Sequence, residues 1–167
     1  KARTPQELAE DIVFWTEDFP SPSAVVVLRD TLDRADSRWI SAFREADGVS
    51  HLCGVMEGLA ESRDQYLEEG DSFNPQQVPP EEVQAEREVV RCLMILLNKA
   101  TGLKTLEGSA NLWPVLARSA MDSASEDVRT SLLKVLTVKA ETGADGLKAV
   151  LNALGVVKVR RSGTARF

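Results

Sequence analysis

The chain has 167 residues, which is enough for one domain with a substantial hydrophobic core. Hydrophobic residues make up 43% of it and charged residues 28%, as is typical of soluble globular proteins. No run of 18 or more apolar residues occurs, so we expect no membrane-spanning segment. Because the chain begins with Lys1 rather than methionine, we expect it to be a piece of a longer protein.

The net charge of −6 is distributed unevenly along the chain. Residues 1–56 carry 6 basic and 10 acidic side chains, residues 57–88 carry 2 and 10, and residues 89–167 carry 12 and 6. An acidic middle segment would repel the phosphate backbone, so nucleic acid is not an expected partner. The acidic segment could attract a basic peptide, or it could simply be a solvated loop.

The first half of the chain predicts four helices. Thr4, Pro5 and Glu7 form a capping-box pattern that opens the first helix, which ends at Phe19-Pro20. The second begins at Ser21-Pro22, and Asp36 or Ser37 caps a short third helix that is broken at Asp47-Gly48. The fourth helix is predicted over 48–67, and the acidic, proline-containing loop after it, 68–80, is expected to be mobile.

A long central helix opens at Pro80 and is almost wholly apolar from Val89 to Leu97. A helix that is apolar on nearly every face must lie between neighbouring elements. We expect Thr101-Gly102 to form its C-cap, with the glycine in the left-handed conformation. A short helix is predicted to follow over 103–107.

Three further helices complete an all-α prediction, because no useful period-two run occurs. They cover about 111–121, then a segment capped by Ser123 or Ser125, and finally 142–154. The last helix is predicted to face inward through Leu147, Val150 and Leu151 and to end at Gly155. The basic tail after it, 156–167, is expected to fray, with acidic surfaces as a weak possible target.

Two spacings recur along the chain and indicate internal repeats. Leu112, Val115 and Leu116 are matched 35 residues later by the inward residues of the last helix, and 60 residues earlier by Leu52, Val55 and Met56. The long helices match at an offset of 39, where Val89, Leu93 and Leu96 correspond to Val128, Leu132 and Val135. Short, middle and long inner helices repeating every 35–40 residues are typical of a right-handed α-solenoid of armadillo-type repeats.

No residues in the sequence form a catalytic pattern. The acidic pairs Glu68-Glu69 and Glu81-Glu82 lack a histidine or nucleophile nearby, and no glycine-rich phosphate loop occurs. Cys53 and Cys92 lie in apolar helical runs and are expected to be reduced, buried thiols, which suits an intracellular compartment. We therefore expect no enzyme activity, no metal site and no cofactor.

A stretch of the second half resembles a known family. The run Val89-Val90-Arg91-Cys92-Leu93, then Leu97-Asn98-Lys99, then Gly102-Leu103-Lys104-Thr105-Leu106, is similar to the GTPase-binding/FH3 regulatory region of Diaphanous-type formins. The resemblance covers roughly residues 4–155. It implies a helical GTPase-binding subdomain over 1–46, armadillo repeats over 47–155, and a separate basic tail over 156–167.

The resemblance also implies the partners. A Rho-family GTPase in its GTP form would bind across the helical subdomain and the first repeat, with contacts at Asn98, Lys99, Thr101 and Lys104. The C-terminal autoinhibitory segment of the same formin would occupy a groove of the repeats, lined by Arg91, Met94, Leu133, Lys134 and Thr137. GTPase binding would displace that segment and release actin assembly, in a cytoplasmic, cytoskeleton-associated protein.

A second hypothesis stays open from the sequence. The chain could be a structural armadillo adaptor that mediates protein contacts or dimerisation and binds no GTPase. The family's repeat array normally continues further, so the chain is either truncated or a short divergent version, and Lys134 suits an apolar peptide poorly.

Overall fold

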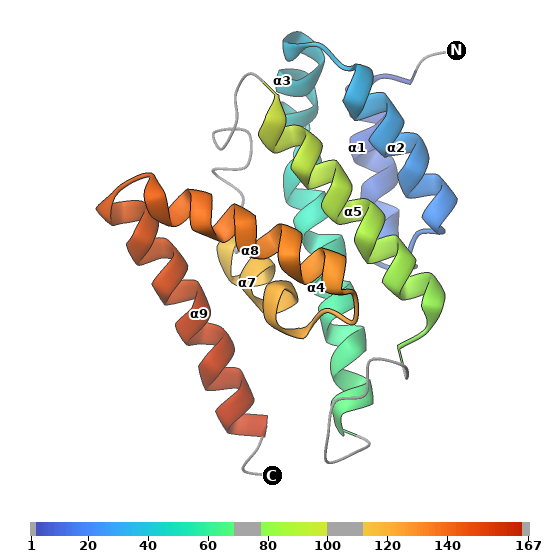
Figure 1. The fold of residues 1–167 in the computed structure, drawn as a ribbon. Coiled ribbons are helices and arrows are strands. Elements are labelled where there is room, and N and C mark those ends of the chain that lie inside the picture. The colour runs from blue at the N-terminus through green and yellow to red at the C-terminus, as the bar shows by residue number, and fades with distance from the viewer. Residues whose placement is uncertain (1–2, 69–77, 100–111, 165–167) are drawn as a thin grey trace.

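A computed structural model describes residues 3–68, 78–99 and 112–164, and every regular element in these ranges is an α-helix (Figure 1). No strand occurs in them, so the all-α prediction is confirmed for this part of the chain. The helices, in chain order, are α1 (Pro5–Trp15), α2 (Pro22–Arg34), α3 (Ser37–Glu45), α4 (Gly48–Glu68), α5 (Pro80–Asn98), α7 (Leu112–Asp122), α8 (Glu126–Glu141) and α9 (Ala144–Thr164).

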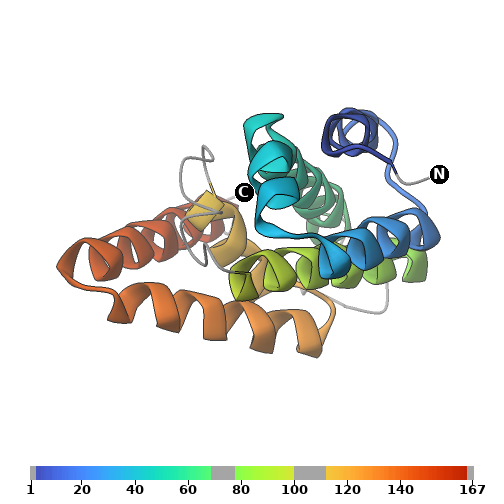
Figure 2. The same cartoon turned by 90° about the horizontal axis from the view of Figure 1, so that it is seen from above.

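The helices form two layers, which are clearest from above (Figure 2). In one layer α5 packs against α2 on one side and α8 on the other. In the second layer α7 packs between α4 and α9. Helices α1 and α3 pack against α4 at the N-terminal end of the molecule. A single cluster of buried apolar side chains runs through both layers, from Leu8 on α1 to Val157 on α9.

The predicted helix starts are confirmed by hydrogen bonds. The Glu7 amide donates to Thr4 Oγ1 at 3.2 Å, and the Thr4 amide donates back to Glu7 Oε2 at 2.9 Å. Ser21 caps α2, Asp36 rather than Ser37 caps α3, and Ser125 rather than Ser123 caps α8. Each cap satisfies a backbone amide that the first turn of a helix leaves without an intrahelical partner.

The turn between α3 and α4 lies where the sequence predicted a break. Asp47 has a φ of 61°, a left-handed conformation that aspartate tolerates better than most residues. Gly48 follows, and a Cβ atom there would lie 2.4 Å from the ring of Phe43. Glycine is therefore required by close packing, since the buried Phe43 ring fills the space that a side chain would need.

The position of α5 explains its composition. Helices α2, α4 and α8 all pack against it, and Val89, Val90, Cys92, Leu93 and Leu96 are buried there. The prediction that the central helix lies between neighbours is therefore confirmed. Helix α5 ends at Asn98, and its C-cap is Lys99 in an extended conformation. The predicted glycine cap at Thr101-Gly102, the helix over 103–107 and most of the loop over 68–80 lie outside the described residues.

The prediction for the last helix is wrong at its end. Helix α9 continues through Gly155 to Thr164, so the first part of the predicted fraying tail is helical. The physical reason is burial: Val150, Ala153 and Val157 share one helical face, and all three are buried against the core. Packing of Val157 beyond Gly155 outweighs the low helix propensity of one glycine.

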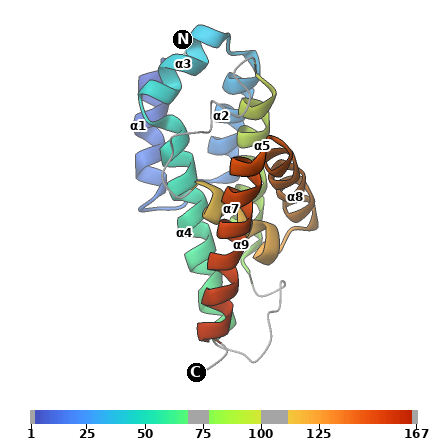
Figure 3. The same cartoon turned by 90° about the vertical axis from the view of Figure 1, so that its left-hand side faces the viewer.

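The inward face predicted for the last helix is also partly wrong. Val150 is buried, but Leu147 is 47% exposed and Leu151 is 58% exposed. Helix α9 packs against α7 and α8, and it forms one side of the molecule (Figure 3). One face of α9 is therefore buried, and these two leucines lie on another.

Candidate protein-binding surface

Helix α5 presents one stripe of polar and half-buried side chains to solvent. Arg87, Arg91, Met94 and Asn98 follow one another at i, i+4, i+7 and i+11, which places them on one helical face. Arg91 and Asn98 are exposed, and Met94 is half-buried against the core. The stripe therefore combines an arginine and an amide with accessible apolar surface.

A buried carboxylate fixes the arginines beside this stripe. Glu88 is 2% exposed, and its two carboxylate oxygens accept from Arg29 Nη1 of α2 at 2.5 Å and from Arg91 Nη1 at 2.7 Å. Gln84 Nε2 donates to the same carboxylate at 3.3 Å. Arg29 also pairs with Asp30 at 3.5 Å, so two carboxylates balance the two guanidinium groups, and the side chain of Arg91 is 49% exposed. The structure thus holds a fixed cation next to Met94.

Helix α8 carries the other residues that the sequence predicted to line a groove. Leu133, Lys134 and Thr137 are all exposed on α8, which packs beside α5. Arg87 on the α5 stripe pairs with Asp127 at the start of α8 at 3.3 Å, which ties the two helices together on their solvent side. We call the six side chains the α5–α8 surface: Arg91, Met94, Asn98, Leu133, Lys134 and Thr137.

Thr137 and Lys134 restrict the kind of ligand that the α5–α8 surface can bind. Thr137 Oγ1 donates to the Leu133 carbonyl at 2.8 Å, so its proton is already used within the helix. Lys134 is exposed, so this surface also carries a lysine, which suits an apolar ligand poorly. The surface therefore favours a ligand that carries acidic groups as well as apolar ones.

Lys99 has a structural role that the sequence analysis did not include. Its ammonium donates to the Asp33 carbonyl at 2.7 Å and to the Ala35 carbonyl at 3.2 Å. These carbonyls lie at the C-terminal end of α2, where backbone acceptors lack intrahelical partners and a cation is favourable. Lys99 therefore ties the end of α5 to the end of α2.

The other predicted GTPase contacts are only partly described. Asn98 is the last residue of α5 and is exposed, so its side chain is available to a ligand. Thr101 and Lys104 lie outside the described residues.

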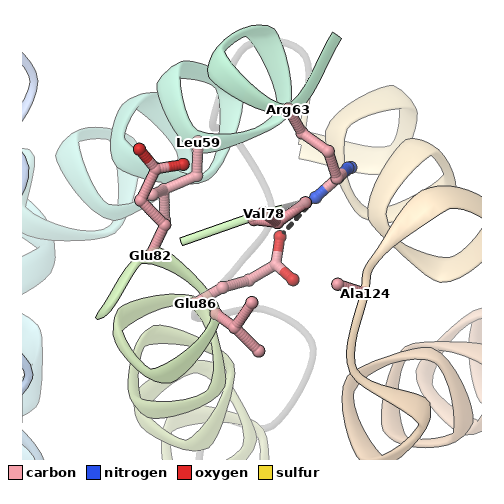
Figure 4. Close-up of a pocket in the computed structure, with 7 residues that line it drawn as sticks. Leu59, Arg63, Val78, Glu82, Glu86 and Ala124 are labelled. Carbon is pink, nitrogen blue, oxygen red and sulfur yellow. Dashed lines mark hydrogen bonds and ion pairs between the residues drawn. The ribbon is translucent and has the colours of Figure 1, made fainter. Parts of the chain in front are cut away.

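The opposite end of α5 carries a buried polar junction (Figure 4). Arg63 Nη1 on α4 pairs with Glu86 Oε2 on α5 at 2.7 Å, and both side chains are at most 5% exposed. Ser123, which precedes α8, donates through Oγ to the other oxygen of Glu86. Arg118 on α7 pairs with Asp64 and also donates to the Ala60 carbonyl at 3.4 Å. This junction holds α4, α5 and α7 together.

A small cavity borders this junction. It has a volume of about 10 Å³, which is about the space of one water molecule. Arg63 Nε and Nη2 are buried there and have no hydrogen-bond partner among the described residues. Its lining residues are Leu59, Arg63, Val78, Glu82, Val83, Glu86 and Ala124. The cavity is too small for a substrate, so these groups act in packing.

The two thiols are buried, as the sequence predicted, and are free rather than joined in a disulfide. Burial raises the pKa of Cys53 to about 12, with Glu57 adding to the effect. Burial also raises the pKa of Cys92, with Glu88 adding, and its Sγ lies 3.9 Å from the Val25 carbonyl. Both thiols are thus protonated near neutral pH and are poor nucleophiles or metal ligands.

Two properties of the described residues bear on other classes of function. Among those residues, no group of three or more His, Cys, Asp and Glu side chains is arranged to hold a metal ion. None of the helices in the described ranges has both the length and the hydrophobicity that crossing a bilayer demands.

The roles of Arg29 and Glu88 and the junction of Arg63 with Glu86 were not predicted from the sequence. The spacing of Glu88 and Arg91 could have indicated an ion pair on one helix. The pairs between helices span 59 and 23 residues in sequence, and no local pattern encodes such contacts.

Comparison with known proteins gives no further guide. No family model matches the chain, and no curated protein or solved structure is significantly similar to it. The basis for a functional assignment is therefore the α5–α8 surface together with the residues that carry the formin resemblance.

Proposed function

We propose that this chain is a non-enzymatic, regulatory protein-recognition domain built as a right-handed armadillo-type solenoid. Burial at the repeated positions of α4, α5, α7 and α8 supports the repeat, whereas in α9 only Val150 of the three matching residues is buried. Leu52, Val55 and Met56 on α4 are buried, as are Leu112, Val115 and Leu116, which share their spacing on α7. The long helices α5 and α8 likewise bury Val89, Leu93 and Leu96, and Val128, Leu132 and Val135.

The single observation that carries a recognition function is the α5–α8 surface. An arginine held on a buried glutamate lies next to half-buried Met94, on a helix packed between two others. A preorganised cation beside apolar surface suits a protein segment with both acidic and apolar side chains. The described cavity, at about 10 Å³, offers no comparable room for a small substrate.

The identity of the partners rests on the resemblance to the formin regulatory region. The proposed ligands are a Rho-family GTPase in its GTP form, at the Asn98 end of α5 and the N-terminal helices, and an autoinhibitory segment on the α5–α8 surface. Because each ligand would weaken the binding of the other by the same factor, GTPase binding would release the segment. The domain would then act in the cytoplasm on the actin cytoskeleton.

The test is a calorimetric titration of the domain with a panel of Rho-type GTPases, each loaded with a non-hydrolysable GTP analogue or with GDP. At least one GTPase should bind at least about tenfold tighter in the GTP form. Asn98→Ala should weaken that binding about tenfold, because it removes an exposed amide at the proposed contact.

A matched control separates a local contact from a general effect. Asn152 is an exposed asparagine on α9, which packs against α7 and α8, and Asn152→Ala should leave the affinity unchanged. Equal binding of the GDP and GTP forms, or no binding to any member of the panel, would contradict the GTPase proposal.

A second candidate function is an adaptor that binds proteins independently of nucleotide. The observation that favours it is Lys99, whose ammonium is bound to carbonyls of α2 instead of facing solvent as a contact residue would. A partner that binds the α5–α8 surface with equal affinity whether or not a GTPase is present would support this candidate over the first.

A further inference from the structure

The guanidinium group of Arg63 is buried, yet only one of its three nitrogens has a partner among the described residues. Arg63 is 3% exposed, and its Nη1 donates to Glu86 at 2.7 Å. Nε and Nη2, which lie along one edge of the planar group, have no hydrogen-bond partner in the described part of the chain. A buried donor that makes no hydrogen bond keeps the full cost of its desolvation. This edge of Arg63 therefore requires an acceptor.

The cavity at the junction of α4 and α5 is lined by this arginine (Figure 4). Its volume of about 10 Å³ is enough for one water molecule and too little for a larger group. Leu59, Val78 and Val83 form its apolar lining. A space of this size beside buried polar groups is the setting in which proteins hold an ordered water.

Glu82 supplies the other kind of partner that a buried water needs. Its side chain lines the same cavity and is half-buried, and its two carboxylate oxygens accept from Ser62 Oγ, each at 3.2 Å. A carboxylate has about four acceptor sites, so Glu82 can also accept a proton from water. Two bonds from Arg63 and one to Glu82 make about three, which is the usual number for a buried water.

The charges of the lining favour water over an ion. A guanidinium edge with two N–H groups would also suit a small anion, but Glu82 and Glu86 place two negative charges beside the single positive charge of Arg63. An anion would therefore be repelled by the lining as a whole. A cation cannot accept hydrogen bonds from Arg63, whereas water both accepts and donates.

We propose that this cavity is a binding site for one water molecule, which accepts from Nε and Nη2 of Arg63 and donates to the carboxylate of Glu82. The water joins α4 to α5 beside the connection between α7 and α8. The site is separate from the α5–α8 surface, and it does not depend on the function proposed above.

The test uses two substitutions of nearly equal shape at Ala124, whose methyl group points toward Glu86 across the cavity (Figure 4). Ala124→Val and Ala124→Thr both fill the space of the water, but only threonine brings an oxygen that can accept from Arg63. In urea denaturation, the unfolding equilibrium constant should be at least about tenfold larger for the valine variant. In a dry cavity, valine would be at least as stable as threonine, and that result would overturn the proposal.

Ala35 provides the matched control. It is also a half-buried alanine that directly precedes a helix N-cap, and it does not line the cavity. Ala35→Val should therefore be at least as stable as Ala35→Thr. If threonine were favoured equally at both positions, the preference would come from the residue type rather than from a water site, and the proposal would be overturned.

Oxygen-17 relaxation dispersion of the solvent counts the waters directly. The wild-type chain should hold one more long-lived water than either Ala124 variant, and equal counts in all three proteins would contradict the site. Exchanging fluoride for bromide at equal ionic strength should shift the thermal midpoints of the wild type and of Ala124→Val alike. A shift in the wild type alone would show an anion in the cavity instead of water.

Discussion

At the scale of single residues, the ion pairs of α5 differ sharply in their surroundings. Arg63 and Glu86 are almost fully buried, whereas Arg87 and Asp127 have side chains that are 32% and 81% exposed. A buried charge that loses its partner keeps its desolvation cost, and an exposed one is solvated by water. Helix α5 therefore carries one buried and one exposed ion pair, and their contributions to stability can be compared directly.

Arg63→Met should lower the free energy of unfolding by about 3–5 kcal/mol, since it leaves the Glu86 carboxylate buried with only Ser123 as a donor. Arg87→Met removes the exposed pair and should cost at most about 1 kcal/mol. Urea denaturation of both variants measures the difference. Similar losses in the two variants would show that the junction at Arg63 does not hold α4 and α5 together.

The buried thiols predict a loss of stability at alkaline pH. Their pKa values are raised in the folded chain, so above pH 9 the unfolded thiols ionise while the folded ones stay protonated. Their contribution to stability is complete below pH 9 and is lost as the pH rises toward about 12, by up to about 1.4 kcal/mol per pH unit for each thiol.

The check compares the wild type with the Cys53→Ala, Cys92→Ala double variant between pH 8 and 10.5 by urea denaturation. The variant will be less stable at pH 8 because of lost packing, yet its stability should fall less steeply with pH. Parallel curves would mean that the thiols do not contribute to the pH dependence.

At the scale of elements, two glycines at helical positions should respond in opposite ways to the same substitution. Gly155→Ala should stabilise the fold by about 0.5–1 kcal/mol, because the site is open and alanine is the better helix former. Gly48→Ala should destabilise it by about 1–3 kcal/mol, because the new Cβ would lie against the ring of Phe43. Thermal unfolding at low protein concentration measures both, and a shared sign would contradict the packing described for α9 and α4.

The end of α2 should depend on a residue of another element. Lys99→Met removes two charge-assisted hydrogen bonds to α2 carbonyls and should cost about 1–2 kcal/mol. Amide exchange in the last turn of α2 should quicken, while exchange in α8 should not. Lys134→Met, at an exposed lysine, is the control and should change neither. Unaltered exchange at α2 would mean that the tie is not formed in solution.

The elements also show what the sequence could and could not predict. Capping residues such as Thr4, Ser21 and Asp36 act within one turn, so their local patterns located the helix starts. The end of α9 depends on burial of Val157 by other helices, which outweighs the local signal of Gly155. Exposure of Leu147 and Leu151 depends on which helices pack against α9. A periodic sequence pattern does not identify those neighbouring helices.

The candidate surface, like the helices, could be predicted from the sequence only in part. The stripe from Arg91 to Asn98 follows from helical periodicity and from the repeat, and the structure places it on the solvent side of α5. Glu88, which fixes Arg91, lies three residues away on α5, but its other partner Arg29 and the carbonyls that bind Lys99 belong to α2 or its C-terminal end. Such long-range contacts decide whether a polar residue is available to a partner, and local sequence does not encode them.

At the scale of the whole molecule, α5 connects the buried junction, the α5–α8 surface and the contact with the end of α2. Its N-terminal half carries the buried junction with α4, its middle carries the fixed Arg91, and its end carries Asn98 and the tie from Lys99 to α2. One buried cluster runs continuously through both layers. A partner that binds the end of α5 therefore contacts an element that packs against both α2 and α8.

The central claim is that an active Rho-type GTPase binds at the Asn98 end of α5. Hydrogen exchange of the chain, alone and with the GTPase loaded with a non-hydrolysable GTP analogue, tests this most directly. The account predicts slower exchange in the C-terminal half of α5 and in the N-terminal helices, with α9 unchanged. Protection confined to α9, or the same protection with the GDP form, would contradict it.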